Sequence, residues 1–468
     1  MVFSSPVFLW LFLPLCCGLN LCCGRHLKLS NAVLLIFSLF FYAWGEPVHV
    51  LLMLACIVIS WAAGRGILAL KDARPGAARL VLALGILADL AALFHYKYAG
   101  FAASLVNRAL GTALPVSEAA LPIGISFFTF QAISYLADLW RGDAEGRPTL
   151  TETALYISFF PQLIAGPIVQ YRDISAQLCD RHITREGFAL GFRRFIIGLG
   201  KKVLIANAVG QGADKLFPMD FANLNTGLCW LGAVLYTLQI YYDFSGYSDM
   251  AIGLGRMFGF TIPENFDLPY LSRSVTEFWR RWHISLGSWF RQYVYIPLGG
   301  NRKGFARTCV NLAVVFLLTG VWHGAGWTYI AWGAMFAVLS VAERLGLKRL
   351  LDRHALLSRV YLLLVVTLGW VIFRSDTLPR AIAFIKRMLM PWAYWTNAGA
   401  TWQPTLRMTI ITVLGILGAG PLQRLIPEKG MARWRHSLPE ACALLLVLIL
   451  CMAALAADTY NPFIYFQF

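Results

Sequence analysis

Charged side chains are scarce in this chain of 468 residues. Asp, Glu, Lys and Arg make up 14% of it, against about 25% in soluble domains. Hydrophobic residues make up 58%, and the mean hydropathy is +0.62. This composition excludes a soluble globular enzyme and a disordered chain, and the apolar stretches lack the period-two alternation of a β-barrel. We therefore predict an all-α polytopic membrane protein, with one integral-membrane domain over residues 1–468 and no separate soluble domain.

Acidic residues are scarcer than basic ones, with 24 Asp and Glu against 40 Lys and Arg, so the net charge is +16. In a membrane protein such an excess is typical of basic cytoplasmic loops, and we expect no nucleic-acid partner. If the N-terminus lies outside the cytoplasm, alternating spans place 32 of the 40 basic residues on the cytoplasmic side. They fall in segments 25–28, 65–79, 141–147, 172–202, 256–307, 344–359 and 424–435.

Several motifs of soluble enzymes are missing. The sequence contains no Walker A, GxGxxG, HExxH or GxSxG motif, and its ten cysteines form no CxxC pair. Gly253-Leu254-Gly255 resembles only a fragment of a dinucleotide loop and lacks a βαβ context. We therefore expect neither a metal site nor disulfides, with the cysteines as small residues facing lipid or neighbouring helices.

Uncharged segments dominate the chain instead. The first, residues 1–24, is followed by Arg25 and Lys28, whereas a cleavable signal peptide carries its positive charge before the apolar core. We predict a retained first span with a periplasmic N-terminus. Many later segments are shorter than the roughly 20 residues of a full span, and some contain Pro or Gly, as at Phe160-Pro161. We expect about ten to thirteen transmembrane and re-entrant helices. The later segments lie near 30–45, 47–64, 80–94, 120–139, 153–171, 187–211, 226–242, 308–342, 357–373, 380–420 (interrupted) and 441–457.

The longest uncharged stretch covers residues 308–342. As one straight helix it would measure about 52 Å, well beyond the apolar thickness of about 30 Å. We predict a break within residues 322–327, where Gly324 and Gly326 loosen the backbone. His323 then lies inside the membrane, where an ionisable residue is a candidate functional group by default. The alternative is a neutral imidazole that is satisfied by a backbone carbonyl.

A cluster of basic and aromatic residues starts at Glu277. Trp279, Trp282 and Trp289 beside arginines are typical of a helix at the cytoplasmic interface, with its rings at headgroup depth. The alternative is that the basic residues bind a phosphate-bearing donor while His283 points into the core. The two accounts stay open at this stage. The candidate phosphate-binding residues are Arg280, Arg281, Arg291, Arg302 and Lys303.

Asp243 and Asp249 end an otherwise apolar segment, and six residues on an ideal helix place them about 240° apart. The intervening Ser245-Gly246 suggests a bend. Structural pairing with arginines is favoured over an acid–base pair. Asn265 lies in a constrained polar loop. Together with Trp322, these residues are our candidates for lining a substrate site.

The chain resembles the membrane-bound O-acyltransferase (MBOAT) superfamily, and within it the bacterial alginate O-acetyltransferase AlgI branch. Each motif alone is a weak indication, but the motifs occur together in the family's order along nearly the whole chain, and this combination is specific. The motifs are residues 1–5 (MVFSS), 41–44 (FYAW), 122–127 (PIGISF), 160–168 (FPQLIAGPI), 243–255 (DFSGYSDMAIGLG), 278–300, 321–324 (VWHG) and 462–466 (PFIYF).

The resemblance implies two functional histidines, matching His283 and His323, the second being catalytic. It implies a helix bundle around a central tunnel in the bacterial inner membrane. It also implies acetyl transfer from cytoplasmic acetyl-CoA, as acyl donor, to an exopolysaccharide of the alginate or cellulose type. Periplasmic partners of the AlgJ and AlgX type would complete the transfer. His323 would accept the proton of the attacking hydroxyl, and a covalent acetyl-histidine is not excluded.

Two other interpretations remain. One is a D-alanyl transferase, or a lipid or protein O-acyltransferase, of the same superfamily. The other belongs to a different class: a transporter whose buried histidine relays protons.

Overall fold

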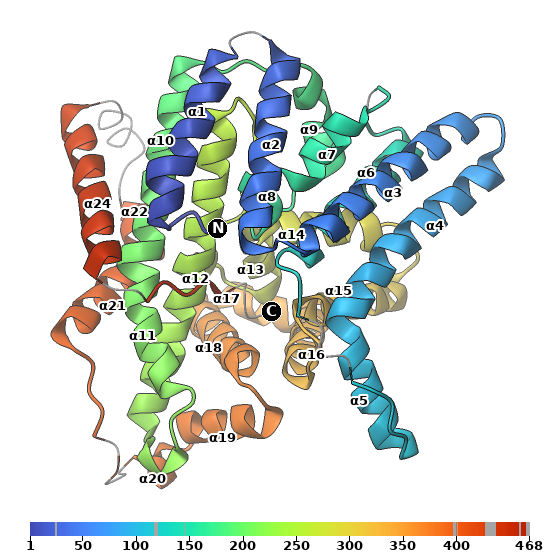
Figure 1. Cartoon of the computed structure of the whole chain (residues 1–468). Coiled ribbons are helices and arrows are strands. Elements are labelled where there is room, and N and C mark those ends of the chain that lie inside the picture. The colour runs from blue at the N-terminus through green and yellow to red at the C-terminus, as the bar shows by residue number, and fades with distance from the viewer. Residues whose placement is uncertain are drawn as a thin grey trace. The chain divides into compact units, whose positions relative to one another are not determined.

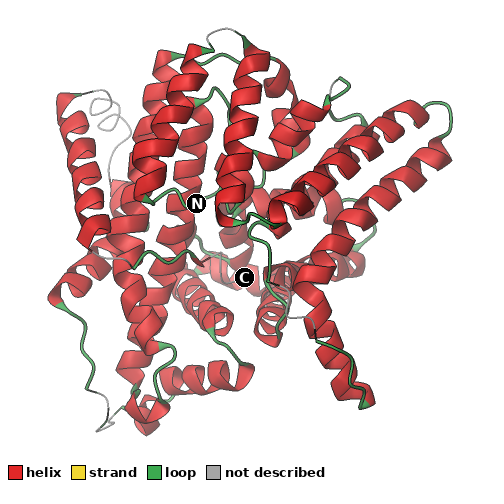
Figure 2. Cartoon of the chain, viewed as in Figure 1, coloured by secondary structure: helices red, strands yellow, loops and turns green. Residues whose placement is uncertain are grey.

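The structure is a computed structural model that describes residues 1–23, 26–116, 120–144, 146–395, 399, 401–425, 437–457 and 460–464. Helices joined by loops form nearly all of this part of the chain (Figure 2), whose β-pairing is limited to one isolated bridge between Phe266 and Trp282. The predicted all-α class is confirmed. Arg25, residues 426–435, Tyr465 and Phe466, which entered the predictions above, lie outside the described residues.

The chain divides into two compact units. The first combines Met1–Phe195 with Ser248–Glu264, and the second combines Ile196–Tyr247 with Asn265–Phe468. Figure 1 shows α3 and α4 of the first unit as an antiparallel helix pair. The helices that begin in the first unit are η1 Phe8–Phe12, α1 Leu13–Cys22, α2 Leu27–Gly45, α3 His49–Leu70, α4 Pro75–Leu93, η2 Phe94–Tyr98, α5 Ala99–Leu110, α6 Ile125–Arg141, α7 Leu150–Ser158, α8 Phe160–Leu163, α9 Tyr171–Cys179 and α10 Arg185–Gly200.

The second unit carries the aromatic core and both candidate histidines. Its long helix α12 runs on into the first unit at its C-terminal end. Its helices are η3 Lys201–Ala206, α11 Asn207–Leu216, η4 Phe221–Asn223, α12 Thr226–Met257, η5 Pro269–Leu271, α13 Val275–Arg281, α14 Ile284–Phe290, η6 Arg291–Tyr295, α15 Phe305–His323, α16 Trp327–Ala342, η7 Glu343–Leu347, α17 Lys348–Arg353, α18 Ala355–Arg374, α19 Leu378–Leu389, α20 Pro391–Tyr394, α21 Leu406–Gly418, α22 Pro421–Leu425 and α24 Leu438–Ala457.

Seven helices in the described residues are long and apolar enough to cross a membrane. Some of the other apolar segments form shorter helices, such as α21, or broken ones, such as α7 and α8 within the predicted segment 153–171, and segment 226–242 lies in the long helix α12. This agrees with a mixture of full spans and partial segments. The seven are Leu27–Gly45, His49–Leu70, Pro75–Leu110, Phe305–His323, Trp327–Arg353, Ala355–Arg374 and Leu438–Ala457.

The first apolar helix of the described residues covers Phe8–Cys22, within the uncharged stretch of residues 1–24. Helix α12 runs unbroken through Gly246 to Met257, so the bend expected at Ser245-Gly246 does not interrupt the helix. Gly246 serves close packing instead: a Cβ there would lie 2.8 Å from the carbonyl oxygen of Gly198.

The predicted break in residues 308–342 is confirmed. Helix α15 ends at His323 and α16 begins at Trp327, and the two helices pack against each other as a hairpin. Glycines permit this close crossing: a Cβ on Gly333 would lie 2.6 Å from the carbonyl oxygen of Phe316. The hairpin therefore fixes where the end of α15, and with it His323, lies relative to α16.

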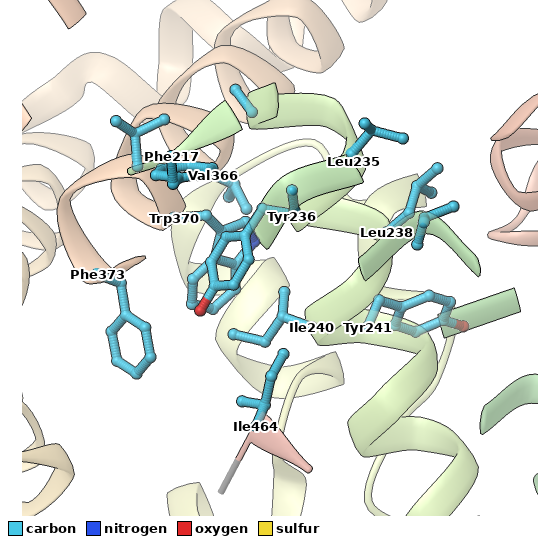
Figure 3. Packing of buried hydrophobic residues seen from close by; sticks show 14 of the residues in the cluster. Phe217, Leu235, Tyr236, Leu238, Ile240, Tyr241, Val366, Trp370, Phe373 and Ile464 are labelled. Atoms are coloured by element: carbon cyan, nitrogen blue, oxygen red, sulfur yellow. The ribbon is translucent and has the colours of Figure 1, made fainter. Parts of the chain in front are cut away.

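A hydrophobic cluster joins α12 to α18 in the second unit. Figure 3 shows Tyr236 from α12 beside Trp370 from α18, with Tyr241, Phe373 and Ile464 as further members of the cluster. All five side chains are buried. Packing at this density holds the elements that carry the candidate site in fixed positions.

Substituting Gly333→Ala should loosen the α15–α16 hairpin, because the new methyl group cannot fit beside the Phe316 carbonyl. Overpacking of this kind costs about 1–3 kcal/mol, so we expect a lower melting temperature in detergent and reduced activity. Gly18→Ala is the matched control, since nothing lies within 4 Å of its Cβ position. Equal melting temperatures for the two variants would contradict the close-crossing account.

Candidate active site

His283 lies in a two-residue junction between α13 and α14. A short antiparallel pairing holds this junction to the preceding polar loop. The amide of Asp267 donates to the carbonyl of Arg281 at 2.9 Å, and the amide of Ile284 donates to the carbonyl of Asn265 at 3.0 Å. His283 is thus bracketed by backbone hydrogen bonds on both sides.

The backbone of His283 is left-handed, with φ 46° and ψ 53°. Positive φ is uncommon for residues other than glycine, although histidine adopts it more often than most. Such a conformation costs about 1–3 kcal/mol and persists only where the surroundings enforce it. The bracketing hydrogen bonds supply that enforcement, so the direction of the imidazole is set by the fold.

The side chain of Asn265 determines the tautomer of His283. Its Oδ1 accepts hydrogen bonds from the Ser285 amide at 3.2 Å and the Ser285 hydroxyl at 2.9 Å, and it lies 3.1 Å from His283 Nδ1. Because a backbone amide can only donate, the Asn265 atom facing it must be the oxygen. His283 Nδ1 must then carry the proton, which leaves the lone pair on Nε2.

His283 Nε2 is buried and has no hydrogen-bond partner among the described residues. Burial, and secondarily the charge of nearby His323, lowers the pKa of His283 well below its usual value. The ring is therefore neutral at neutral pH, and its Nε2 lone pair is available to accept a proton or a hydrogen bond.

His323 is the last residue of α15 and is 7% exposed. Aromatic rings surround its imidazole: the ring centroids of Trp332 and Phe373 lie 5.3 Å and 5.0 Å away. Trp332 belongs to α16 and Phe373 to α18, so three helices enclose this side chain. Such an environment excludes bulk water from the ring.

The second unit brings the two histidines together from segments 40 residues apart in sequence. The Trp322 ring lies beside both, with centroids 4.9 Å from His323 and 6.1 Å from His283. The Phe244 ring from α12 lies nearly perpendicular to the His283 ring, with centroids 4.6 Å apart. The candidate residues His283, His323, Trp322 and Asn265 therefore form one cluster.

The tryptophans near His283 do not form the predicted interfacial anchor. Trp282 and Trp289 are each 4% exposed, and Trp282 packs on Trp370 with ring centroids 4.9 Å apart. Trp279 packs on Trp332 at 5.3 Å. Two helices of seven residues replace the single anchoring helix, because the left-handed His283 separates them.

Asp243 makes an ion pair with Lys202 and a hydrogen bond with Ile464. Its carboxylate pairs with Lys202 at 2.7 Å, with both side chains at most 4% exposed, and it accepts the amide of Ile464 at 2.8 Å. Lys202 also donates to the carbonyl of Pro462. Its partner is thus a lysine, and Lys202 is buried within a helix, not exposed in a basic loop as predicted.

Asp249 belongs to the first unit, and the described partners of its carboxylate belong to the same unit. Arg194 donates to it at 2.8 Å and 3.0 Å and also pairs with Glu264. Asp249 therefore pairs with an arginine, as the preferred expectation for this residue has it.

The five candidate phosphate-binding residues lie on and after α13. Arg280, Arg291, Arg302 and Lys303 are exposed. Arg281 is half-buried and pairs with Glu277 at 3.1 Å and Asp267 at 3.3 Å. Four of the five side chains are therefore open to a ligand, and Arg281 is engaged within the protein.

Sequence reasoning missed several residues that shape the cluster, among them Ser285, Phe244 and Phe373. Glu343 could have been noticed in the sequence, because it is the first charged residue after the uncharged stretch 308–342. Its position there suggests an exposed residue at a helix end, but its side chain is only 2% exposed. The described residues contain no group of three His, Cys, Asp or Glu side chains arranged to hold a metal ion.

Comparison with known proteins agrees with the resemblance to membrane-bound O-acyltransferases. A family model described as MBOAT, membrane-bound O-acyltransferase family, matches residues 124–373, a range that includes both histidines. The probable alginate O-acetylase AlgI of Pseudomonas putida is 39% identical over 492 aligned residues, covering all of both chains.

Two further relatives extend this result. The probable AlgI of Pseudomonas aeruginosa is 44% identical over 393 residues, 83% of this chain and 75% of the relative. The peptidoglycan O-acetyltransferase of Helicobacter pylori is 34% identical over 425 residues, 83% of this chain and 80% of the relative. The described residues contain seven helices long and apolar enough to cross a membrane, and the chain is a multi-pass membrane protein that belongs to the membrane-bound O-acyltransferase family.

Proposed function

We propose that this protein transfers acetyl groups from acetyl-CoA to hydroxyls of an exopolysaccharide of the alginate or cellulose type, with His283 and His323 as its catalytic residues. The observation that carries the proposal is the meeting of the two buried histidines in one aromatic cluster. The identity of 39–44% to probable alginate O-acetylases supports acetyl as the group transferred and a polysaccharide as the acceptor.

His323 acts as the general base in this proposal. A hydroxyl oxygen attacks the thioester carbonyl carbon while the imidazole takes the hydroxyl proton. The carbon–sulfur bond then breaks, and the imidazolium returns the proton to the thiolate, so that free thiol leaves. The enclosure of His323 by Trp332 and Phe373 favours this chemistry, because exclusion of water suppresses hydrolysis of the thioester.

His283 orients the acceptor. In its Nδ1–H tautomer, Nε2 has no hydrogen to donate, so it cannot polarise the thioester carbonyl. It can accept a hydrogen bond from a second hydroxyl of the acceptor and so hold the attacking hydroxyl, whose own proton goes to His323, toward the reacting carbon. Of the two roles expected for His283, orientation of the substrate is therefore favoured over polarisation of the donor.

The donor enters from the cytoplasm in this proposal. Coenzyme A carries phosphates, which Arg280, Arg291, Arg302 and Lys303 are free to bind because they are exposed. Arg281 has a structural role, since it already pairs with Glu277 and Asp267. The protein lies in the bacterial inner membrane with a periplasmic N-terminus, as one acyltransferase domain.

A cavity at His323 that is open to both faces of the membrane would let the acetyl group cross the bilayer while coenzyme A stays on the cytoplasmic side. Periplasmic proteins of the AlgJ and AlgX type would then deliver the group to the polymer. Both this cavity and the partners are predictions from the family resemblance. They are compatible with the buried position of His323 at the C-terminal end of α15, opposite the end that is cytoplasmic in this proposal.

His323→Ala should abolish release of thiol from acetyl-CoA by inverted membrane vesicles, with a loss of at least about 100-fold. His283→Ala should reduce the rate strongly but less. Release is followed with a thiol reagent, and polymer acetylation in cells is measured in parallel. Full activity of a folded His323→Ala protein, or consumption of long-chain acyl-CoA in place of acetyl-CoA, would refute the proposal.

Asn265→Ala should impair the enzyme through His283. It removes the acceptor for His283 Nδ1 and for both Ser285 groups, and each buried donor left unsatisfied costs about 1–3 kcal/mol. We expect kcat to fall and KM for acetyl-CoA to stay constant. Asn311→Ala is the control, because Asn311 is a buried asparagine that bonds instead to the Gly300 carbonyl. Equal kcat values for the two variants would argue against the tautomer-setting role.

Arg302→Gln and Lys303→Gln together should raise KM for acetyl-CoA about 10- to 100-fold, since each charge-assisted hydrogen bond contributes about 1.5–3 kcal/mol. kcat should change little. Acetyl-dephospho-CoA provides the check: if these residues bind the 3′-phosphate, the variant and the wild type should use this donor equally well. An unchanged KM for acetyl-CoA would place the phosphates elsewhere.

A further inference from the structure

Glu343 is a buried carboxylate that the proposed chemistry does not use. It follows the last residue of α16 and is 2% exposed. A carboxylate at such burial requires compensating hydrogen bonds. All the hydrogen bonds described for it come from two places, the first turn of α13 and a tyrosine on α18.

The carboxylate caps the N-terminus of α13. Oε1 accepts the Val275 amide at 2.6 Å, and Oε2 accepts the Thr276 amide at 3.0 Å and the Thr276 hydroxyl at 2.7 Å. Tyr361 adds a longer contact to Oε1 at 3.4 Å. The next amide, that of Glu277, donates to the Ser274 hydroxyl at 3.0 Å. The first three amides of α13 are thereby satisfied, two of them by Glu343.

This contact connects the two elements that carry the histidines. After its last residue, Arg281, helix α13 leads to His283 through Trp282 alone. Helix α16, which precedes Glu343, carries Trp332. The ring centroid of Trp332 lies 5.3 Å from that of His323. The same two helices meet again where Trp279 packs on Trp332 and Phe336, with ring centroids 5.3 Å and 5.0 Å apart.

We infer that Glu343 is a positioning residue: it fixes α13 against α16 and so sets the position of His283 relative to His323. The inference rests on the proposed roles of the two histidines. Because α13 has only seven residues, its own helical hydrogen bonds are few. The anchor at its first turn is therefore a main determinant of where the strained His283 junction lies.

Glu343→Gln tests this inference. The amide replaces one acceptor oxygen with an NH₂ donor that faces backbone donors, so the cap is half lost while size is kept. We expect kcat for thiol release from acetyl-CoA to fall about 10- to 100-fold, the effect of a small misplacement of reacting groups, with KM within two-fold of wild type. Glu343→Asp keeps two acceptors and should recover part of the rate.

Labelling of His283 provides a readout that does not depend on activity. Diethylpyrocarbonate modifies neutral imidazole nitrogens, and the labelled peptide is quantified by mass spectrometry. We expect His283 to be labelled faster in Glu343→Gln than in wild type. The matched control is Thr226→Val, which removes a hydroxyl bond to the Arg387 carbonyl elsewhere in the second unit, and it should change neither kcat nor labelling.

The outcomes separate the two proposals. Wild-type kcat in Glu343→Gln, or a decrease no larger than in Thr226→Val with unchanged labelling, overturns the positioning role. Should Glu343→Gln fail to accumulate, Thr276→Val removes only the hydroxyl contact, and unaltered kcat and labelling in that variant count against the inference. If His283→Ala and His323→Ala both remain active, the proposed function fails, whereas a labelling change at His283 would still support the anchor.

Discussion

The hydrogen bond between Asn265 and His283 is the interaction on which the rest of the site depends. It links a polar loop to a strained junction, assigns the proton to Nδ1 and leaves the Nε2 lone pair in the buried interior. The Ser285 amide fixes the orientation of the Asn265 amide group. Without this acceptor the left-handed backbone would carry a buried donor with no partner, so local geometry and chemistry are set together.

Aromatic packing and buried charge hold the surrounding elements in place. Trp322, Trp332 and Phe373 enclose His323 from three helices, and Lys202 and Asp243 hold the last described residues of the chain against α12. Removing one partner of a buried ion pair costs about 3–5 kcal/mol, because it leaves the other charge uncompensated. Asp243 directly precedes Phe244, which contacts His283, so this pair also supports the site.

The fold class and the break after His323 could be predicted because both follow from simple lengths. An uncharged stretch longer than the bilayer must turn, and glycines mark the place. The unbroken course of α12 could not be predicted, since Gly246 is equally suited to a helix break and to close contact with a neighbouring helix. The tryptophans near His283 could not be assigned from sequence for a similar reason: aromatic residues beside arginines suit both a membrane interface and a core.

The candidate site residues also divide into those whose grouping could be predicted from the sequence and those whose partners could not. His283, His323 and Asn265 stand out in sequence as polar groups in an apolar context, and the structure brings them together with Trp322. Asp243 and Asp249 stand out equally, yet they pair with Lys202 and Arg194 in different units. Sequence spacing on one helix does not say which distant segment supplies the partner. The same limit concealed Glu343, whose partners on α13 are 67 and 68 residues away.

The protonation state of His283 tests the central claim most directly. The chain has eight histidines, so imidazole-¹⁵N-labelled protein in lipid vesicles can be compared by solid-state NMR with a His283→Asn variant, whose asparagine tolerates the left-handed backbone. The signal lost in the variant should be that of a neutral ring protonated on Nδ1 and unprotonated on Nε2 at neutral pH. A ring protonated on Nε2, or on both nitrogens, would contradict the account.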